Sequence, residues 1–320
     1  MEIARLEKRV EELAKPIHRV RIDGVFFPQD LFDIQSGLFS QWEETFSYMK
    51  TRCELAENLT KAAYLGEIKA VGEKALIHFL EILRLDARGP QTFLDTAPFL
   101  LLHVHRDDDA FDFMRHWMKM HPINDDKITD TMPRYFESKE GDWMYPREKN
   151  CRYRDMFEDC PNVSDCEAHL SFLVALLIIK CRIVATYDAT YRSIDIAFAT
   201  SAGKRIQAVQ CAVTDMLIDR RLFNIDSQRH QVEHLLNAIH RNNPTMLPAI
   251  LNPAPLLTGY LPRNRVRGDP SEVVSILFDC GRCLLRVPGA QEMLEKRFGK
   301  SPSYDLGRRW GLNDFMSSFM

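Results

Sequence analysis

The sequence predicts an all-α protein in which antiparallel helix pairs stack into an irregular α-solenoid. Apolar side chains recur about every three to four residues through most of the chain, and this repeat gives a helix one buried face. The chain has only 14 glycines among 320 residues. Sandwiches, barrels and doubly wound sheets need glycine at turns and phosphate loops, so this scarcity favours helices. No strict repeat period is present, which predicts degenerate units.

The N-terminal helical half is expected to span residues 1–120. Its helices are expected at residues 3–14, 40–65, 67–85 and 107–120. Pro16 should end the first helix, and residues 18–34 should form a loop with one extended piece. The buried stripe expected for the second helix is Trp42, Phe46, Met49, Cys53 and Ala56. The buried stripe expected for the third helix is Ala70, Leu76, Ile77, Leu80 and Leu83. Short turns between such helices predict antiparallel hairpins.

The remaining chain divides into a connecting loop (121–163), a C-terminal helical half (164–298) and a tail (299–320). The loop is polar and aromatic, contains four prolines and lacks helical periodicity. Ser164 and Glu167 fit a capping box before an almost wholly apolar helix. The helices expected in this half are residues 165–185, 188–199, 203–222, 227–241, 270–286 and 290–298, with a proline-rich loop at 243–269. Asp269 should cap the helix that Pro270 opens.

Charge and composition bear on location and partners. The formal net charge is −3, so no global attraction to nucleic acid or anionic membrane is expected. The two local basic clusters are Arg263, Arg265 and Arg267, then Arg308 and Arg309. The N-terminus lacks an apolar signal segment, and the longest apolar run, Leu170–Ile179, is too short to span a bilayer. The eight cysteines are therefore expected to be reduced, in a cytoplasmic or nuclear protein that is not secreted.

The motif His103-Val-His105-Arg-Asp107 follows an apolar run. A strand ending in His-x-His-x-Asp can bind zinc, because alternation places both imidazoles on one side. This spacing keeps open a metal-dependent hydrolase. The rest of the chain is helical, however, and the sandwich that such a motif needs is missing. Two histidines at a corner between helices, before an acidic helix start at Asp107 or Asp108, is the simpler interpretation.

Three cysteines and a histidine form a second candidate metal site. Cys151, Cys160, Cys166 and His169 have the spacing Cys-x8-Cys-x5-Cys-x2-His, one residue shorter than a Cys3His finger. Such a zinc site could serve nucleic-acid binding. His169 falls inside the helix that Ser164 should cap, so loop thiols and a helix histidine are the plainer alternative.

Two further pairs are expected to be structural. Cys280 and Cys283 lie three residues apart in a helix, which places both thiols on one core face rather than in a redox setting. His230 and His234 are four residues apart, but no third ligand is evident, and they should form a partly solvated face. The sequence contains no Gly-x-x-x-x-Gly-Lys-Ser/Thr, Gly-x-Gly-x-x-Gly or Gly-x-Ser-x-Gly motif, so nucleotide binding and serine hydrolysis have no support.

Three stretches in order resemble a family of uncharacterised proteins of filamentous fungi. They are Ala75–Leu85 running into Thr96–Trp117; Gly141-Asp-Trp143 followed by His169–Lys180; and Leu251-Asn-Pro253 with Pro288-Gly-Ala-Gln291. Together they cover roughly residues 60–298. The resemblance implies a tetratricopeptide-like all-helical fold and an intracellular setting of fungal type. It supplies no catalytic residues.

The function expected from these features is a scaffold or adaptor that binds another protein of unknown identity. Stacked amphipathic helices without a catalytic constellation commonly present binding grooves. Aromatic residues in the long loop, Trp143, Tyr145 and Tyr153, would suit such a surface. An enzyme is the less favoured class, and no cofactor is expected. The metal-dependent hydrolase and the zinc or nucleic-acid binder remain the alternatives.

Overall fold

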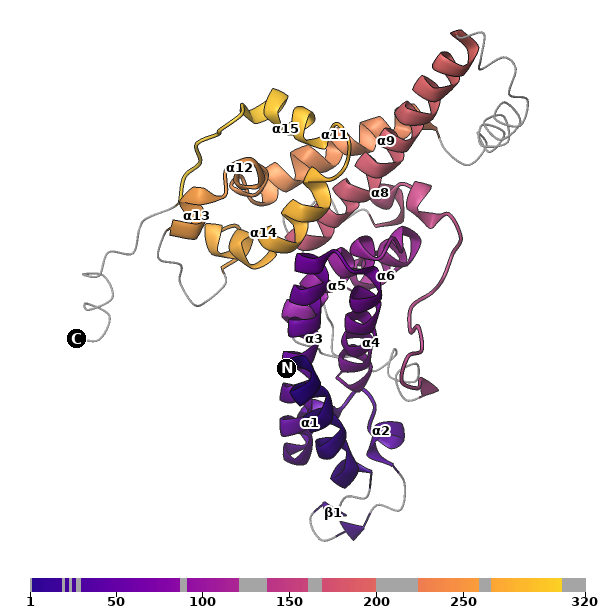
Figure 1. The fold of residues 1–320 in the computed structure, drawn as a ribbon, viewed down its shortest axis with the longest axis vertical. Helices are drawn as coiled ribbons and strands as arrows, with labels where there is room; N and C mark the ends of the chain where they lie inside the picture. Colours follow the sequence, from indigo (N-terminus) through magenta and orange to yellow (C-terminus); the bar gives the residue numbers. More distant parts are fainter. Residues whose placement is uncertain are drawn as a thin grey trace, which may run out of the picture. The chain divides into compact units, whose positions relative to one another are not determined.

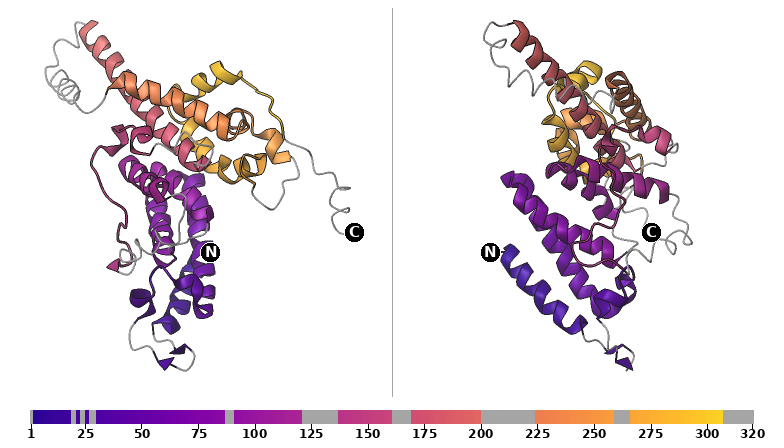
Figure 2. Two further views of the ribbon diagram at one scale, coloured as in Figure 1. Left: turned by 180° about the vertical axis from the view of Figure 1, so that it is seen from behind. Right: turned by 90° about the vertical axis from the view of Figure 1, so that its right-hand side faces the viewer.

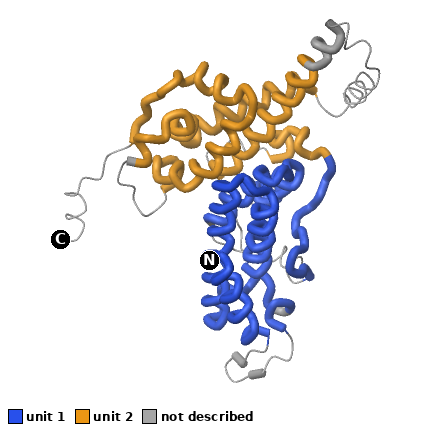
Figure 3. The backbone as a smooth tube through the Cα atoms, viewed as in Figure 1, with its two compact units in different colours: residues 1–149 blue, residues 150–320 orange. Residues whose placement is uncertain are grey.

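The computed structural model describes residues 2–18, 21–22, 25–26, 30–86, 91–120, 137–160, 169–199, 224–258 and 266–306. Their fold is all-α, as predicted, apart from one two-stranded pairing and one isolated bridge (Figure 1). The chain divides into two compact units, residues 1–149 and 150–320 (Figure 3). The division falls inside the segment 121–163.

Unit 1 is built on consecutive helices that pack against one another. They are α1 (Glu2–Ile17), α2 (Leu31–Ile34), the 3-10 helix η1 (Phe39–Gln41), α3 (Glu43–Gly66), α4 (Lys69–Leu85), α5 (Gln91–His103) and α6 (Asp107–Met120). The strands β1 (Arg21–Ile22) and β2 (Val25–Phe26) pair antiparallel before α2. Helices α3 and α4 form a hairpin, α5 packs on α4 and α6, and α1 runs beside α3 (Figure 2).

The hairpin turn between α3 and α4 shows how the chain reverses. Glu67 adopts a left-handed conformation with φ of 54°, and its backbone N–H caps the carbonyl of Ala63. Further along α4, a Cβ on Gly72 would lie 2.9 Å from Cγ1 of Val104, in the turn after α5. Glycine at this position therefore lets α4 and the end of α5 approach closely.

The buried faces of α3 and α4 differ from the predicted stripes. Phe46 is 52% exposed, and Trp42, Met49 and Cys53 are only partly buried, whereas Ala56 is buried as expected. The face that α1 and α4 cover is instead Thr45, Tyr48, Arg52, Leu55, Ala56, Leu59 and Ala63. On α4, Leu76, Leu80 and Leu83 are buried as predicted, but Ala70 and Ile77 are exposed, and Glu81 and Arg84 are buried. The prediction ranked residues by apolarity alone, so it missed charged groups that pair in the interior.

Unit 2 is arranged around the long helix α9. Its elements are the 3-10 helix η2 (Cys151–Tyr153), α8 (Met156–Asp159), α9 (Leu170–Ala199), α11 (Ile225–Asn242), α12 (Met246–Leu251), α13 (Ala254–Thr258), α14 (Pro270–Leu285) and α15 (Ala290–Phe298). Helices α11 and α14 pack on α9, and α12 packs on α11, α14 and α15. Every residue from Leu170 to Cys181 is buried, as predicted for a central helix.

Several boundaries correct the predictions. Residues 188–199 continue α9 rather than forming a second helix. The expected proline-rich loop at 243–269 contains α12 and α13, since proline is tolerated in the first turn of a helix. Pro16 lies inside the last turn of α1. Asp269 caps α14 as predicted, accepting a hydrogen bond from the backbone of Ser271. The capping box at 164–167, the helix at 203–222 and the tail after residue 306 lie outside the described residues.

One helix among the described residues could cross a membrane by length and composition. The stretch Leu170–Arg192 of α9 has a mean hydropathy of 1.9. The prediction that the apolar run is too short stopped at Ile179, but the helix continues past Lys180, which is itself buried. Of the 18 consecutive residues in this stretch with the highest hydropathy, 72% are buried inside the protein. A core helix of this kind passes the same test as a membrane span, so the finding is weak support for a membrane.

Candidate functional site

A cavity of about 500 Å³ lies in unit 1. Helices α1, α2, α3 and α4 line it together with Lys139 and Glu140 from the segment after α6. The lining includes the imidazole of His78 and, among its charged side chains, Arg52, Lys74, Glu81, Arg84 and Glu140. Three of them, Arg52, Glu81 and Arg84, are at most 3% exposed. Charged groups are this deeply buried only when they are paired, so the pairing defines the site.

Glu81 and Arg84 form a bidentate ion pair on α4. The guanidinium donates from Nε to Oε2 at 2.7 Å and from Nη2 to Oε1 at 2.6 Å. A spacing of three residues places both side chains on one helix face, so the pair forms within a single turn. Burial raises the pKa of Glu81, while the hydrogen bonds and charge of Arg84 oppose that rise.

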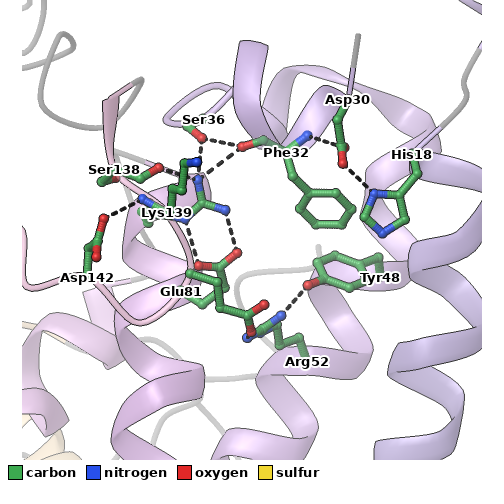
Figure 4. Close-up of polar contacts among 12 residues, drawn as sticks. His18, Asp30, Phe32, Ser36, Tyr48, Arg52, Glu81, Ser138, Lys139 and Asp142 are labelled. Carbon is green, nitrogen blue, oxygen red and sulfur yellow. Dashed lines mark hydrogen bonds and ion pairs between the residues drawn. The ribbon is translucent and has the colours of Figure 1, made fainter.

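The remaining nitrogen of Arg84 ties three parts of unit 1 together. Nη1 donates to the carbonyl oxygens of Phe32 and Ser138, each at 3.0 Å, and to Oγ of Ser36 at 2.6 Å (Figure 4). Ser36 in turn donates to the carbonyl of Phe32 at 2.6 Å. Arg84 thus connects α4 to the end of α2 and to the segment that follows α6.

Arg52 on α3 is the second buried cation. Its Nη1 donates to the hydroxyl of Tyr48, one turn earlier on α3, and its Nη2 donates to Oε1 of Glu140. The side chain of Arg52 is 4% exposed, whereas that of Glu140 is 58% exposed. The Nε of Arg52 is buried and has no hydrogen-bond partner in the described part of the chain. A surface carboxylate therefore reaches in to pair with a buried guanidinium.

The titratable groups around Arg52 have shifted pKa values. Burial raises the pKa of Tyr48 to about 12, although the charge of Arg52 lowers it. Burial, followed by the charge of Arg52, lowers the pKa of His78 to about 4. Burial pushes the pKa of Glu140 upward, but the charge and hydrogen bond of Arg52 outweigh it and leave that pKa below its usual value. At neutral pH the site thus holds a neutral tyrosine, a neutral imidazole and an ionised Glu140.

An aromatic wall closes another side of the site. Asp30 caps α2 by accepting from the backbone N–H of Phe32 at 3.0 Å, and it also lies 2.5 Å from Nδ1 of His18. The Phe32 ring lies 4.9 Å from the ring of His18 and 5.2 Å from that of Tyr48 (Figure 4). This wall joins the end of α1 to α2 and α3.

This cluster was not predicted from the sequence, although the sequence contains a signal for part of it. Glu81 and Arg84 interrupt the otherwise apolar run from Phe79 to Leu85 at a spacing of three. A pair of opposite charges inside an apolar run indicates a buried ion pair rather than a solvated face. No comparable local signal marks Glu140, because its partner lies 88 residues away.

The histidines considered for a hydrolase lie at a helix corner. His103 is the last residue of α5 and packs edge-on against the ring of Tyr64 at 4.9 Å. His105 is exposed, with φ of 63°, and α6 begins at Asp107. The strand interpretation is therefore wrong. Asp107 is the first helical residue rather than the cap, and it places an acid in the first turn. Among the described residues, no cluster of three or more His, Cys, Asp or Glu could hold a metal ion.

The Cys3His candidate is only partly visible in unit 2. Cys151 is buried in η2, Cys160 is buried just after α8, and His169 immediately precedes α9. Cys166 lies outside the described residues, so the full set of four ligands remains a prediction. Of the predicted basic clusters, Arg267 is exposed and the other four arginines are outside the described ranges.

The two pairs expected to be structural lie as predicted, the cysteines in the core and the histidines on a partly solvated face, with His230 exposed and His234 partly buried. Cys280 and Cys283 are both buried on α14, and burial raises the pKa of Cys280 well above its usual value, which suits a core thiol. The ring of His234 stacks on Phe157 at 3.8 Å, while the rings of His230 and His234 are 6.4 Å apart.

Lys180 is a buried amine in unit 2. Its Nζ donates to the carbonyl oxygens of Arg152 at 2.8 Å and Arg154 at 2.6 Å, and to Oε1 of Gln228 at 3.0 Å. Burial lowers its pKa to about 7. These bonds fasten η2 to α9 and α11, so Lys180 organises unit 2 from within.

Comparison of the chain with protein-family models, with curated proteins and with solved structures gives no match. A tyrosine with a pKa near 12 and an imidazole with a pKa near 4 are poorly matched to proton transfer at neutral pH. Paired charges and aromatic rings around an open cavity suit recognition of a polar ligand better.

Proposed function

We propose that this chain is a protein-interaction scaffold of tetratricopeptide-like helix pairs, and that the cavity of unit 1 receives a segment of its partner. One observation carries the proposal: a single cavity of about 500 Å³ is lined by aromatic rings and by charged side chains of both signs. Helical scaffolds bind extended partner segments through such pre-positioned groups. A cytoplasmic or nuclear location belongs to the same proposal.

The arrangement of the helices supports this proposal. Helices α1 and α4 both pack on α3, and all three helices contribute residues to the lining of the cavity. Lys74 on α4 forms an ion pair with Glu7 on α1 across the cavity lining. That pair is half-exposed, so its net contribution to stability is small and a ligand could replace it at little cost.

The test is to block the cavity without disturbing the fold. Ala14 lines the cavity from α1 and is partly exposed, so Ala14→Trp should fill it. Ala70 on α4 is exposed and does not line the cavity, so Ala70→Trp is the matched control. Affinity purification from the native cell, read by mass spectrometry, should recover a partner with the wild type and with Ala70→Trp but not with Ala14→Trp. Equal recovery with both variants would refute the role of the cavity.

A further inference from the structure

We propose that Arg52 anchors a carboxylate subsite in this cavity, and that Glu140 occupies the subsite until an acidic side chain of the partner protein displaces it. The inference rests on the proposed function and names the chemistry of the partner segment.

The charge balance of the cluster requires an anion at this place. Two cations, Arg52 and Arg84, are buried, and each is 3% exposed. One anion, Glu81, is buried with them and is fully engaged by Arg84. A second negative charge is needed, because an uncompensated buried charge is costly. Glu140 supplies that charge from the surface.

Glu140 leaves one donor of the Arg52 guanidinium unsatisfied. Glu140 takes only Nη2, while Nε, on the same edge of the guanidinium, has no hydrogen-bond partner in the described structure. A free carboxylate approaching this edge could accept from both nitrogens in the bidentate arrangement that Arg favours. An incoming acidic side chain would therefore satisfy a donor that the internal carboxylate leaves unsatisfied.

The backbone around Glu140 allows its side chain to leave. Residues 139–142 form a turn, in which the N–H of Asp142 bonds to the carbonyl of Lys139 at 3.0 Å. The carboxylate of Asp142 also accepts from the backbone N–H of Lys139 at 2.8 Å. The preceding carbonyl, that of Ser138, stays bonded to Arg84 (Figure 4). The exposed Glu140 side chain can thus rotate outward while the turn keeps its anchors.

The lining of the cavity selects a single negative charge. Glu7 in the lining is paired with Lys74, whereas the carboxylates of Glu11 and Asp33 share the lining with one further lysine, Lys139. One negative charge at Arg52 restores the balance that Glu140 provides. A phosphate dianion would add a second charge beside these acids. The subsite therefore fits the carboxylate of Asp or Glu better than a phosphate.

Chemical rescue tests the subsite without knowledge of the partner. Glu140→Ala removes the atoms of one acetate ion, so acetate is the probe, added to the full chain at constant ionic strength with chloride. Glu140→Ala should be destabilised, and acetate should restore stability saturably. At ten times its dissociation constant, acetate should lower the unfolding equilibrium constant roughly tenfold. The wild type should respond little, because Glu140 already fills the subsite.

The matched control is Glu148→Ala. Glu148 is also an exposed loop glutamate bonded to an arginine, but that arginine, Arg115, keeps Asp112 as a second partner. Acetate should therefore not rescue Glu148→Ala, nor the double variant Arg52→Met/Glu140→Ala. Equal rescue of Glu140→Ala and Glu148→Ala, or no rescue of either, overturns the proposal. A larger effect of phosphate than of acetate overturns the assignment to a carboxylate. The two proposals can fail separately. If acetate does not rescue Glu140→Ala but Ala14→Trp still fails to recover the partner, the subsite is rejected and the scaffold function is retained.

Discussion

The interior position of Arg84 makes its replacement an informative perturbation of unit 1. Arg84→Met keeps an unbranched side chain of similar length but removes the charge and every donor. Glu81 is then left buried without its partner, which costs about 3–5 kcal/mol. The carbonyl of Ser138 loses its bond from Arg84 at a cost of about 1 kcal/mol, while the carbonyl of Phe32 keeps the hydroxyl of Ser36. The expected loss in free energy of unfolding is therefore about 5 kcal/mol.

Urea unfolding followed by tryptophan fluorescence measures this loss, because the signal comes mainly from unit 1. Three of the four tryptophans, Trp42, Trp117 and Trp143, lie in unit 1. The matched control is Arg5→Met on α1, because Arg5 pairs with Glu2 at the same spacing of three residues but on the exposed surface. The control should not change the unfolding midpoint measurably, since exposed pairs contribute little.

A second variant separates the loss of charge balance from the loss of packing. Glu81→Met/Arg84→Met removes both charges together, and it should be more stable than Arg84→Met by about 3 kcal/mol, because paired apolar residues often replace a buried ion pair without loss. The deficit of Arg84→Met should also grow from pH 5 to pH 8. Burial raises the pKa of Glu81 and Arg84 opposes that rise, so removal of Arg84 leaves the folded-state pKa still further above its unfolded value. Arg84→Met should therefore lose stability more steeply than the wild type as the pH rises. A deficit below about 1 kcal/mol, or a double variant no more stable than the single one, would refute this account of the cluster.

Two other perturbations probe positions outside that cluster. Lys180 has a folded-state pKa of about 7 against 10.5 when unfolded, so the unfolded chain holds an extra proton between these values. Wild-type stability relative to Lys180→Met should therefore rise by up to about 1.4 kcal/mol per pH unit from pH 7 to pH 10 in urea titrations; a constant difference would contradict it. Gly72→Ala should lose about 1 kcal/mol because its Cβ meets Val104, whereas Gly281→Ala, which faces open space, should gain about 0.5–1 kcal/mol. Thermal unfolding measures both effects. An equal increase in Tm for Gly72→Ala and Gly281→Ala would argue against the close contact at Gly72.

The elements that were predicted well are those specified by local chemistry. Helix α14 begins at Pro270 behind the cap Asp269, and α11 and α15 lie close to their predicted ranges. Caps, prolines and a repeat of about three to four residues act within one or two turns, so they can be read from neighbouring residues. The continuous α9 was missed because the prediction ended one helix near residue 185, where the apolar run gives way to polar residues, and began another at 188. A long helix, however, can be buried at one end only.

The buried faces were harder to predict than the helices. On α3 the buried face is the one that carries Tyr48 and Arg52, whereas Phe46 of the predicted apolar stripe is exposed. Which face is buried depends on where α1 and α4 pack, and a charged residue can occupy that face once a distant partner neutralises it. No periodicity within α3 contains that information.

The sequence by itself determined that the chain is helical, where many of its helices begin and end, and that no familiar catalytic motif is present. These properties depend on side chains within a few residues of each other. The tertiary structure alone decided that Arg52 meets Glu140, 88 positions away, and that Arg84 meets Ser138, 54 positions away. Such pairings form when helices pack, because charge compensation acts through space and leaves no mark in the local order of residues.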